Sequence, residues 1–311
     1  MEFAHRPVMG REAIELLACK SGGVYVDGTL GGGGHARMIL DAASPDGRLI
    51  GIDRDDDALK AAAGNLEAYG NRVTLVKENF RNIRRVLSGL GISGVDGIVL
   101  DLGVSSYQFE SPERGFSFRF EARLDMRMDR ARGETAYDLV NTRGEDELTG
   151  IFRDYGEERE ARRIARAIVR ARETKPIETT GDLVNLILFT IPKRFQAKGI
   201  HPATRVFQAL RIAVNDELGS LGQGLAEGFE ALNKNGRMAV ISFHSLEDRI
   251  VKNAFRELST GCVCPPRMPV CVCGRTPKAK LVTRKAIKPS DAEVNENPRA
   301  RSAKLRAIEK F

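Results

Sequence analysis

The segment Val24-Tyr-Val-Asp-Gly-Thr-Leu-Gly-Gly-Gly-Gly-His35 decides the fold, because a short apolar run ends on an aspartate and continues into four consecutive glycines. The apolar run predicts a buried strand. The glycines predict a turn in which the backbone can approach a ligand closely, since no Cβ is in the way. A helical pattern follows from about Ala36 and presents its first N–H groups to the turn. Strand, glycine-rich turn and helix in this order indicate a ligand-binding α/β domain.

Outward from this segment, strand-like and helix-like patterns alternate. Helices are expected at 56–68 and 83–89, between further strands at 48–53, 73–76 and 97–101. Connections of helix length between strands predict a parallel, doubly wound sheet.

The alternation then stops, and the next convincing strand lies at 237–242, followed by a helix at 247–258. About 135 residues separate this strand from the one at 97–101, more than one crossover helix can use. Helical patterns fill the gap at 145–155, 157–173, 180–191 and 204–218. We therefore expect a helical domain at 111–214, inserted into a sheet domain formed by 1–110 and 215–311. Short β-like runs near 281–283 and 304–308 are expected to form an antiparallel edge pair.

Three aspartates end predicted strands and are expected to converge at one edge of the sheet: Asp27, Asp53 and Asp101. A carboxylate in the position of Asp53 accepts hydrogen bonds from ribose hydroxyls in such folds. Two ligand classes fit, because Gly31-x-Gly33-x-x-Ala36 also matches the dinucleotide pattern. S-adenosylmethionine (AdoMet) is favoured, since its ammonium and sulfonium charges suit acidic strand ends that would repel a pyrophosphate.

Composition excludes several classes of protein. With 311 residues, 42% of them apolar and 29% charged, the chain is neither disordered nor fibrous. Its longest apolar stretch, 183–191, is too short to span a bilayer, and the N-terminus has no signal-peptide pattern. We therefore expect a cytoplasmic protein without a membrane partner. The net charge of +7 is concentrated in 261–311, where twelve Lys and Arg stand against four Asp and Glu, and this favours a polyanionic partner.

Seven ordered motifs resemble those of the ribosomal small-subunit methyltransferase H family, also called MraW, and the resemblance runs from His5 to about Leu305. They are Asp101-Leu-Gly-Val-Ser-Ser106, Glu113-Arg-Gly-Phe-Ser-Phe118, Leu124-Asp-Met-Arg-Met-Asp129, Tyr155-Gly-Glu-Glu158, His201-Pro-Ala-Thr-Arg-Val-Phe-Gln-Ala-Leu-Arg211, Ser242-Phe-His-Ser-Leu-Glu-Asp-Arg249 and Asn297-Pro-Arg-Ala-Arg-Ser302. Glu160 departs from the pattern, where an apolar or aromatic residue is expected.

The resemblance implies a class I AdoMet-dependent methyltransferase fold, a Rossmann-like doubly wound sheet with an inserted helical domain. It implies methyl transfer from AdoMet to the N4 amine of cytidine 1402 in 16S rRNA, with the small ribosomal subunit as partner; a homodimer is left open. The AdoMet contacts that it implies are Gly33, Gly34, His35, Asp53, Phe80, Asp101 and Gln108.

The chemistry at an exocyclic amine points to Asp101. Because the lone pair of this amine is delocalised into the base, a carboxylate that accepts an amine hydrogen would help to localise it and later take the proton. A role in cofactor binding alone is equally open. Ser105, Ser106 and His244 are weaker candidates for base contact, and His244 also fits a structural role. Methylation at carbon would need a cysteine nucleophile, and no Pro-Cys dipeptide occurs.

Arginines of the predicted helix 157–173, among them Arg162 and Arg166, share one face and can follow phosphates. Pairing with glutamates of the same helix (Glu157, Glu158 and Glu160) is the alternative. Arg205 and Arg211 form a second candidate ridge for RNA.

Four cysteines crowd into one short segment: Cys262, Cys264, Cys271 and Cys273. Four thiolates can bind Zn²⁺ tetrahedrally, but the one-residue gap within each pair is tighter than the usual two. This spacing slightly favours a reduced, metal-free loop, and a bound metal would be structural.

Three alternative functions would each require a sequence feature of their own. A DNA amino methyltransferase predicts an Asp/Asn-Pro-Pro-Tyr/Phe element, where this chain has Asp101-Leu-Gly-Val. An NAD(P)-dependent oxidoreductase would need an acid or base residue that assists hydride transfer, and the sequence offers no candidate for it. A non-catalytic RNA-binding protein would not need an intact cofactor turn.

Overall fold

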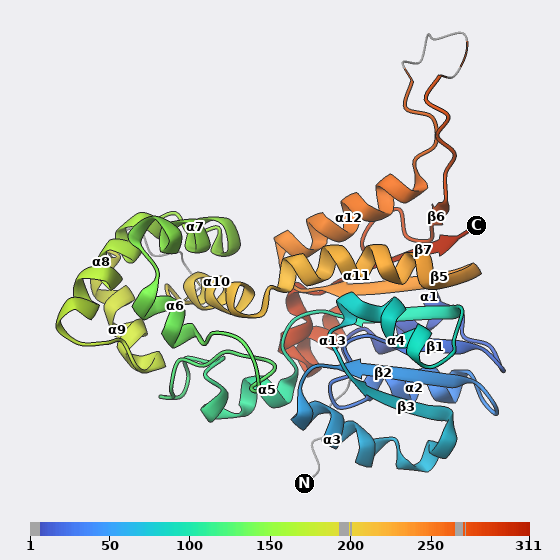
Figure 1. Cartoon of the computed structure of the whole chain (residues 1–311), viewed down its shortest axis with the longest axis horizontal. Coiled ribbons are helices and arrows are strands. Elements are labelled where there is room, and N and C mark those ends of the chain that lie inside the picture. The colour runs from blue at the N-terminus through green and yellow to red at the C-terminus, as the bar shows by residue number, and fades with distance from the viewer. Residues whose placement is uncertain (1–6, 193–198, 200, 265–269, 271) are drawn as a thin grey trace. The chain divides into compact units, whose positions relative to one another are not determined.

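The computed structural model describes residues 7–192, 199, 201–264, 270 and 272–311. The chain divides into two compact units (Figure 1). The sheet unit comprises Met1–Gly103 and Leu218–Phe311, and the helical unit comprises Val104–Glu217.

The sheet unit contains one sheet of seven strands in the order β3-β2-β1-β4-β5-β7-β6. The strands are β1 Val24–Asp27, β2 Arg48–Asp53, β3 Val73–Lys77, β4 Val95–Asp101, β5 Leu232–Ser242, β6 Ala279–Leu281 and β7 Lys304–Lys310. The first five in this order pair in parallel, and β7 runs antiparallel to both β5 and β6. This confirms the predicted doubly wound sheet and its antiparallel edge pair, and it is the arrangement expected of a class I methyltransferase.

Alternate residues of the central strands enter two different cores, because successive side chains of a strand point to opposite faces. Val26, Ile98 and Met238 belong to one core, whereas Tyr25 and Val99 belong to the other. The helices of the sheet unit are α1 Gly10–Leu17, α2 Gly34–Ala42, α3 Asp56–Asn65, α4 Ile83–Gly89, α11 Glu217–Ala231, α12 Ser245–Ser259 and α13 Asp291–Glu296. Helices α4, α11 and α12 pack on the first core, and α1, α2 and α3 pack on the second. Cys19 packs half-buried against the second core.

The helical unit has its own apolar core, which includes Phe152, Ile164, Leu183 and Leu210. Its helices are α5 Ser106–Glu110, α6 Ala136–Thr142, α7 Glu145–Gly156, α8 Ala161–Thr174, α9 Thr180–Thr190 and α10 Thr204–Asn215.

The long loop before α6 is held from within the helical unit. Buried Arg114 donates from Nη2 to the carbonyls of Arg127 and Met128, both at 3.0 Å. Asn215 accepts from Met128 N and donates to Met126 O. These bonds satisfy backbone groups that would otherwise be buried without partners.

Two helix predictions differ from the structure because single residues adopt left-handed conformations. Asp216 (φ 46°) ends α10 and separates it from α11, where one helix at 204–218 was expected. Glu157 (φ 49°) ends α7, so the arginine-rich helix begins at Ala161 rather than 157. Glu160 lies just before α8 and pairs with Arg163 at 3.0 Å, which accommodates its departure from the family pattern.

Among the described residues, no helix combines the length and the apolar character that crossing a bilayer requires.

Candidate active site

Three carboxylates gather at one edge of the sheet. Asp27, Asp53 and Asp101 end β1, β2 and β4, which are neighbours in the order β2-β1-β4. The carboxyl ends of parallel strands meet at the same edge, so the sheet itself brings these side chains together.

Asp53 fastens the glycine turn to β2. Its Oδ2 accepts from Gly31 N and its Oδ1 accepts from Asp55 N, both at 2.9 Å. Gly31 and Gly33 have positive φ angles of 51° and 84°, which glycine adopts without strain. A Cβ on Gly33 would lie 3.1 Å from Leu66, so the turn also has little room for a side chain there.

Asp27 is 1% exposed. Its Oδ1 accepts from Thr29 N at 3.2 Å, while its buried Oδ2 has no hydrogen-bond donor within the described part of the chain. Burial, reinforced by the nearby negative charge of Asp53, raises the pKa of Asp27 to about 7.

Asp101 is oriented from behind, since its backbone N–H donates to Thr29 Oγ1 at 2.6 Å. Its side chain is 25% exposed, and buried Oδ1 finds no donor in the ranges that the structure covers. Burial raises its pKa well above the usual value, and the charges of Asp27 and Glu247 add to this.

His35, in the first turn of α2, completes this cluster. Its Nε2 lies 3.0 Å from Val8 O, and because a carbonyl can only accept, Nε2 carries a hydrogen. Its Nδ1 lies 3.7 Å from Asp101 Oδ2. In a neutral imidazole this nitrogen carries a lone pair, and 3.7 Å is too long for a hydrogen bond between the ring and the carboxylate.

These residues fit AdoMet better than a dinucleotide. Two buried carboxylate oxygens, on Asp27 and Asp101, require donors, and their mutual repulsion would be relieved by a cation. An ammonium and a sulfonium meet this need, whereas a pyrophosphate would add to the repulsion. The N-terminus of α2, with no side-chain cap, adds N–H groups for the carboxylate end of AdoMet.

Phe80 lies at the same edge, three residues after the end of β3. Its ring lies against α11 at Gly224, where a Cβ would collide with the ring. A Cβ added to Gly28, the residue that follows β1, would lie 3.2 Å from the Cβ of Phe80. Phe80 is therefore placed beside the strand ends, where the resemblance implies adenine.

A family model described as the MraW methylase family matches residues 2–311. The chain belongs to the MraW methylase family. A relative from Citrifermentans bemidjiense, named "Ribosomal RNA small subunit methyltransferase H", is 56% identical over 310 residues, covering 100% of this chain and 99% of the relative. A relative of the same name from Geobacter sulfurreducens is 57% identical and covers 100% of both chains. A solved SAM-dependent O-methyltransferase from Thermotoga maritima has a TM-score of 0.44 and 12% identity, covering 100% of this chain and 68% of that one.

Membership in the MraW methylase family makes this chain a methyltransferase with AdoMet as the methyl donor. The structure brings six of its seven expected AdoMet residues into the sheet unit. The seventh, Gln108, belongs to the helical unit, where it is buried. There it caps α5, as Ser105 N donates to Gln108 Oε1 at 3.0 Å and Gln108 N donates to Ser105 Oγ at 3.2 Å. Its contact with AdoMet stays a prediction, as do the individual roles of the other six.

His244 has a structural role in this MraW methylase. It is the N-cap of α12, and its Nδ1 accepts from Glu247 N at 3.4 Å. Glu247 is 2% exposed, and its Oε2 accepts from the backbone N–H groups of Phe243 and His244. Sequence reasoning missed Glu247 because a glutamate in a first helical turn is an ordinary capping residue. It also missed Thr29, which lies inside the decisive segment and would have been found by asking what positions Asp101.

Arg211, a candidate for RNA binding, is paired within the helical unit, and its contact with RNA stays a prediction. Its guanidinium makes a bidentate pair with Glu217 of the same unit, at 2.8 and 2.9 Å, and its side chain is only 18% exposed. A fork-to-fork pair of this kind neutralises the charge that a phosphate would need. Arg205 is half-buried and donates to Glu157 O at 3.3 Å.

AdoMet should bind this site more weakly in acid. Since Asp27 has a pKa of about 7, lowering the pH below 7 neutralises the carboxylate that faces the cation. If binding requires the ionised form, affinity falls about tenfold for each pH unit below that value. Calorimetric titration from pH 5.5 to 8 measures this slope.

Without AdoMet, ionisation of Asp27 destabilises the folded protein. Its folded pKa lies above the ordinary 3.8, so protonation stabilises the fold and stability declines as pH rises from about 4 to 7. Asp27→Asn should flatten both profiles. An unchanged affinity profile in this variant would show that Asp27 does not face the cofactor.

Proposed function

We propose that this protein transfers the methyl group of AdoMet to the exocyclic N4 amine of a cytidine in 16S rRNA, at the position that the family numbers 1402. The names of the full-length relatives support an rRNA of the small ribosomal subunit as substrate. The observation that carries the proposal is Asp101, whose incompletely paired carboxylate lies at the end of β4 in a cation-seeking site. Its exposed quarter leaves a face for a substrate amine.

Asp101 is suited to hold and then accept the amine proton. When bound, AdoMet supplies the methyl group on a positively charged sulfur. The carboxylate of Asp101 accepts a hydrogen from N4 and so turns the nitrogen lone pair out of conjugation. Once N4 carries the methyl group supplied by AdoMet, Asp101 would take the surplus proton from N4 and release it to solvent. Holding the two reactants in line can contribute about 7–11 kcal/mol to the rate enhancement in favourable cases.

The raised pKa of Asp101 is compatible with this role. In the unliganded site, Asp27 and Glu247 oppose its ionisation. A cation bound beside it reverses the balance and favours the carboxylate form that the reaction needs.

The helical unit is proposed to contact rRNA phosphates through α8. A groove of about 430 Å³ is lined there by Arg162, Arg163, Arg166 and Arg170. Arg162 and Arg166 share a single carboxylate, Glu145 of α7, at 3.5 and 3.3 Å, so the groove keeps a net positive charge. Their side chains are 72% and 50% exposed. The target base must leave any stack to reach the cofactor, which makes backbone contacts at a second surface useful.

Replacing Arg162 and Arg166 together by alanine should weaken binding to small ribosomal subunits without changing AdoMet affinity. Loss of two phosphate contacts should lower the slope of log K against log salt by about 1.4–1.8. Filter binding at several salt concentrations measures it. Arg153→Ala is the matched control, because Arg153 is an exposed arginine of α7 paired with Asp154. An unchanged slope in the double variant would remove α8 from the RNA-binding surface.

With this substrate, we also propose that the enzyme works beside ribosomes in the cytoplasm. The proposal is tested by offering labelled AdoMet with small subunits from cells that lack the gene, with large subunits and with DNA. We expect label in the small subunit alone. Label in DNA but not in subunits would replace this proposal with that of a DNA amino methyltransferase.

A further inference from the structure

The segment between α12 and β6 has no core of its own. None of its described residues from Arg256 to Lys278 is buried, and none of those after Ser259 is in a helix or strand. Val263 and Val272 are 53% and 72% exposed. Figure 1 shows that this arm extends away from the end of α12 before it returns to β6. A segment without buried side chains needs a cross-link to hold one conformation.

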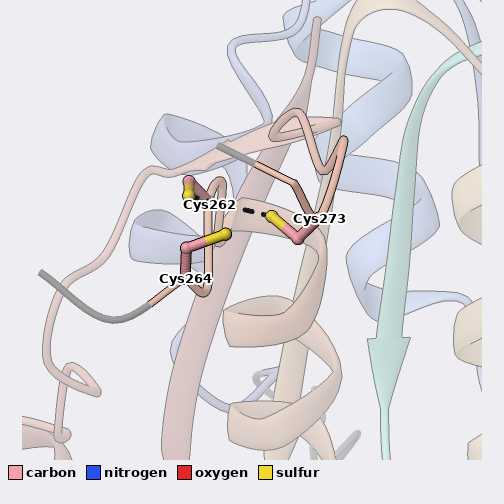
Figure 2. A group of neighbouring side chains, drawn as sticks. All are labelled: Cys262, Cys264 and Cys273. Atoms are coloured by element: carbon pink, nitrogen blue, oxygen red, sulfur yellow. Dashed lines mark hydrogen bonds between the residues drawn. The ribbon is translucent and has the colours of Figure 1, made fainter. Parts of the chain in front are cut away.

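Three thiols of the arm meet at one point. Cys262 and Cys264 lie on its outgoing part and Cys273 on its returning part, and Figure 2 shows their side chains converging. The sulfurs of Cys262 and Cys273 are 3.7 Å apart, and all three sulfurs lie within 4.8 Å of one another. All three are reduced cysteines. Cys271 lies outside the described residues.

The spacing of the sulfurs matches a tetrahedral metal site. With Zn–S bonds of about 2.3 Å, two ligands of a tetrahedron are separated by about 3.8 Å. The Cys262–Cys273 separation already has this value within 0.1 Å, and the third sulfur needs only a small movement. The one-residue gap between Cys262 and Cys264 suits this, because alternate residues of an extended segment point to the same side.

Backbone groups also meet the sulfur of Cys264, because the N–H groups of Val272 and Cys273 donate to it. These two donors come from the returning part of the arm, so they join its two sides at the same point as the sulfurs. A disulfide would use only two of the three thiols and would leave the third without a function.

We propose that Cys262, Cys264 and Cys273 bind a structural Zn²⁺ ion that fixes the arm between α12 and β6. Zinc suits soft thiolate ligands and has no redox chemistry, in keeping with a site at the surface of the sheet unit. The ion would supply the cross-link that the arm's exposed valines cannot provide.

The test is elemental analysis of the full-length protein, purified without a histidine tag and under reducing conditions. We expect one zinc per chain in the parent protein and in Cys19→Ser, a control in which the half-buried thiol outside the arm is removed. Cys262→Ser and Cys273→Ser should each lose most of the metal. Exchange of Co²⁺ into the parent should give a thiolate-to-cobalt charge-transfer band that these two variants lack.

Folding of the variants is checked separately by AdoMet binding, which should stay at the parent value because the arm contributes none of the expected cofactor residues. Limited proteolysis should cleave the arm faster in the serine variants and in parent protein treated with a chelator. Three results would overturn the proposal. They are a parent protein without metal, a metal content that survives Cys262→Ser and Cys273→Ser, and iron in place of zinc. A Cys262–Cys273 disulfide in metal-free protein, seen as a loss of two hydrogens in the intact mass, would identify a redox pair instead.

Discussion

Asp101→Ala should lower the rate of methyl transfer by about 10²- to 10⁴-fold, the range in which a positioned acid or base contributes. The substitution removes the proposed proton acceptor at the end of β4. It also removes one of the two buried carboxylates that are expected to face the positive charge of AdoMet. Single-turnover measurement with saturating AdoMet and RNA separates the chemical step from binding. We expect most of the loss in that step.

Asp101→Asn distinguishes proton transfer from positioning. An asparagine keeps the size and one acceptor oxygen but cannot take the proton, so we expect a rate close to that of the alanine variant. Asn also removes a like charge beside Asp27 and Glu247, and the folded protein should become more stable. Asp96→Asn is the control at the opposite end of β4, where the side chain accepts from Val24 N and pairs with Lys20. A parent-like rate for Asp101→Asn would show that Asp101 only orients ligands.

Asp53→Ala should weaken AdoMet binding by about 100-fold or more. Hydrogen bonds to a charged group contribute about 1.5–3 kcal/mol each, and the expected ribose contacts would be lost. The variant also releases Gly31 N and Asp55 N, which fix the glycine turn. The effect should therefore exceed that of the ribose contacts alone. Isothermal titration calorimetry with AdoMet measures the change.

Asp56→Ala is the matched control for this prediction, because Asp56 is an exposed carboxylate three residues later that pairs with Lys77. A comparison of AdoMet with an analogue that lacks the ribose hydroxyls divides the loss between the ribose and the turn. If Asp53→Ala binds AdoMet as tightly as Asp56→Ala does, the assignment of the cofactor edge is wrong.

The sheet and its acidic edge could be predicted from the sequence because their signals are local. Apolar runs that end on Asp27, Asp53 and Asp101 define both the strands and the residues at their carboxyl ends. The four glycines of 31–34 fix where the turn must lie. AdoMet could be favoured over a dinucleotide because its positive charges suit these aspartates, whereas a negatively charged pyrophosphate does not.

Other features depend on contacts between distant residues, which one sequence does not reveal. Arg211 looks like a free cation until the bend at Asp216 brings Glu217 back to it. The partner of Arg162 and Arg166 is Glu145 of another helix rather than a neighbour on their own. The cysteine spacing looked too tight for zinc when counted along the chain. In the folded arm, Cys262 and Cys273 face each other across its two sides.

The identity of the methylated nucleoside tests the central proposal most directly. Small ribosomal subunits from cells lacking the gene would be incubated with the enzyme and AdoMet, and their 16S rRNA digested to nucleosides for mass spectrometry. We expect N4-methylcytidine with the parent enzyme and none with Asp101→Ala. Methyl groups on carbon 5 of cytidine, or on another base, would contradict an amine reaction at the end of β4.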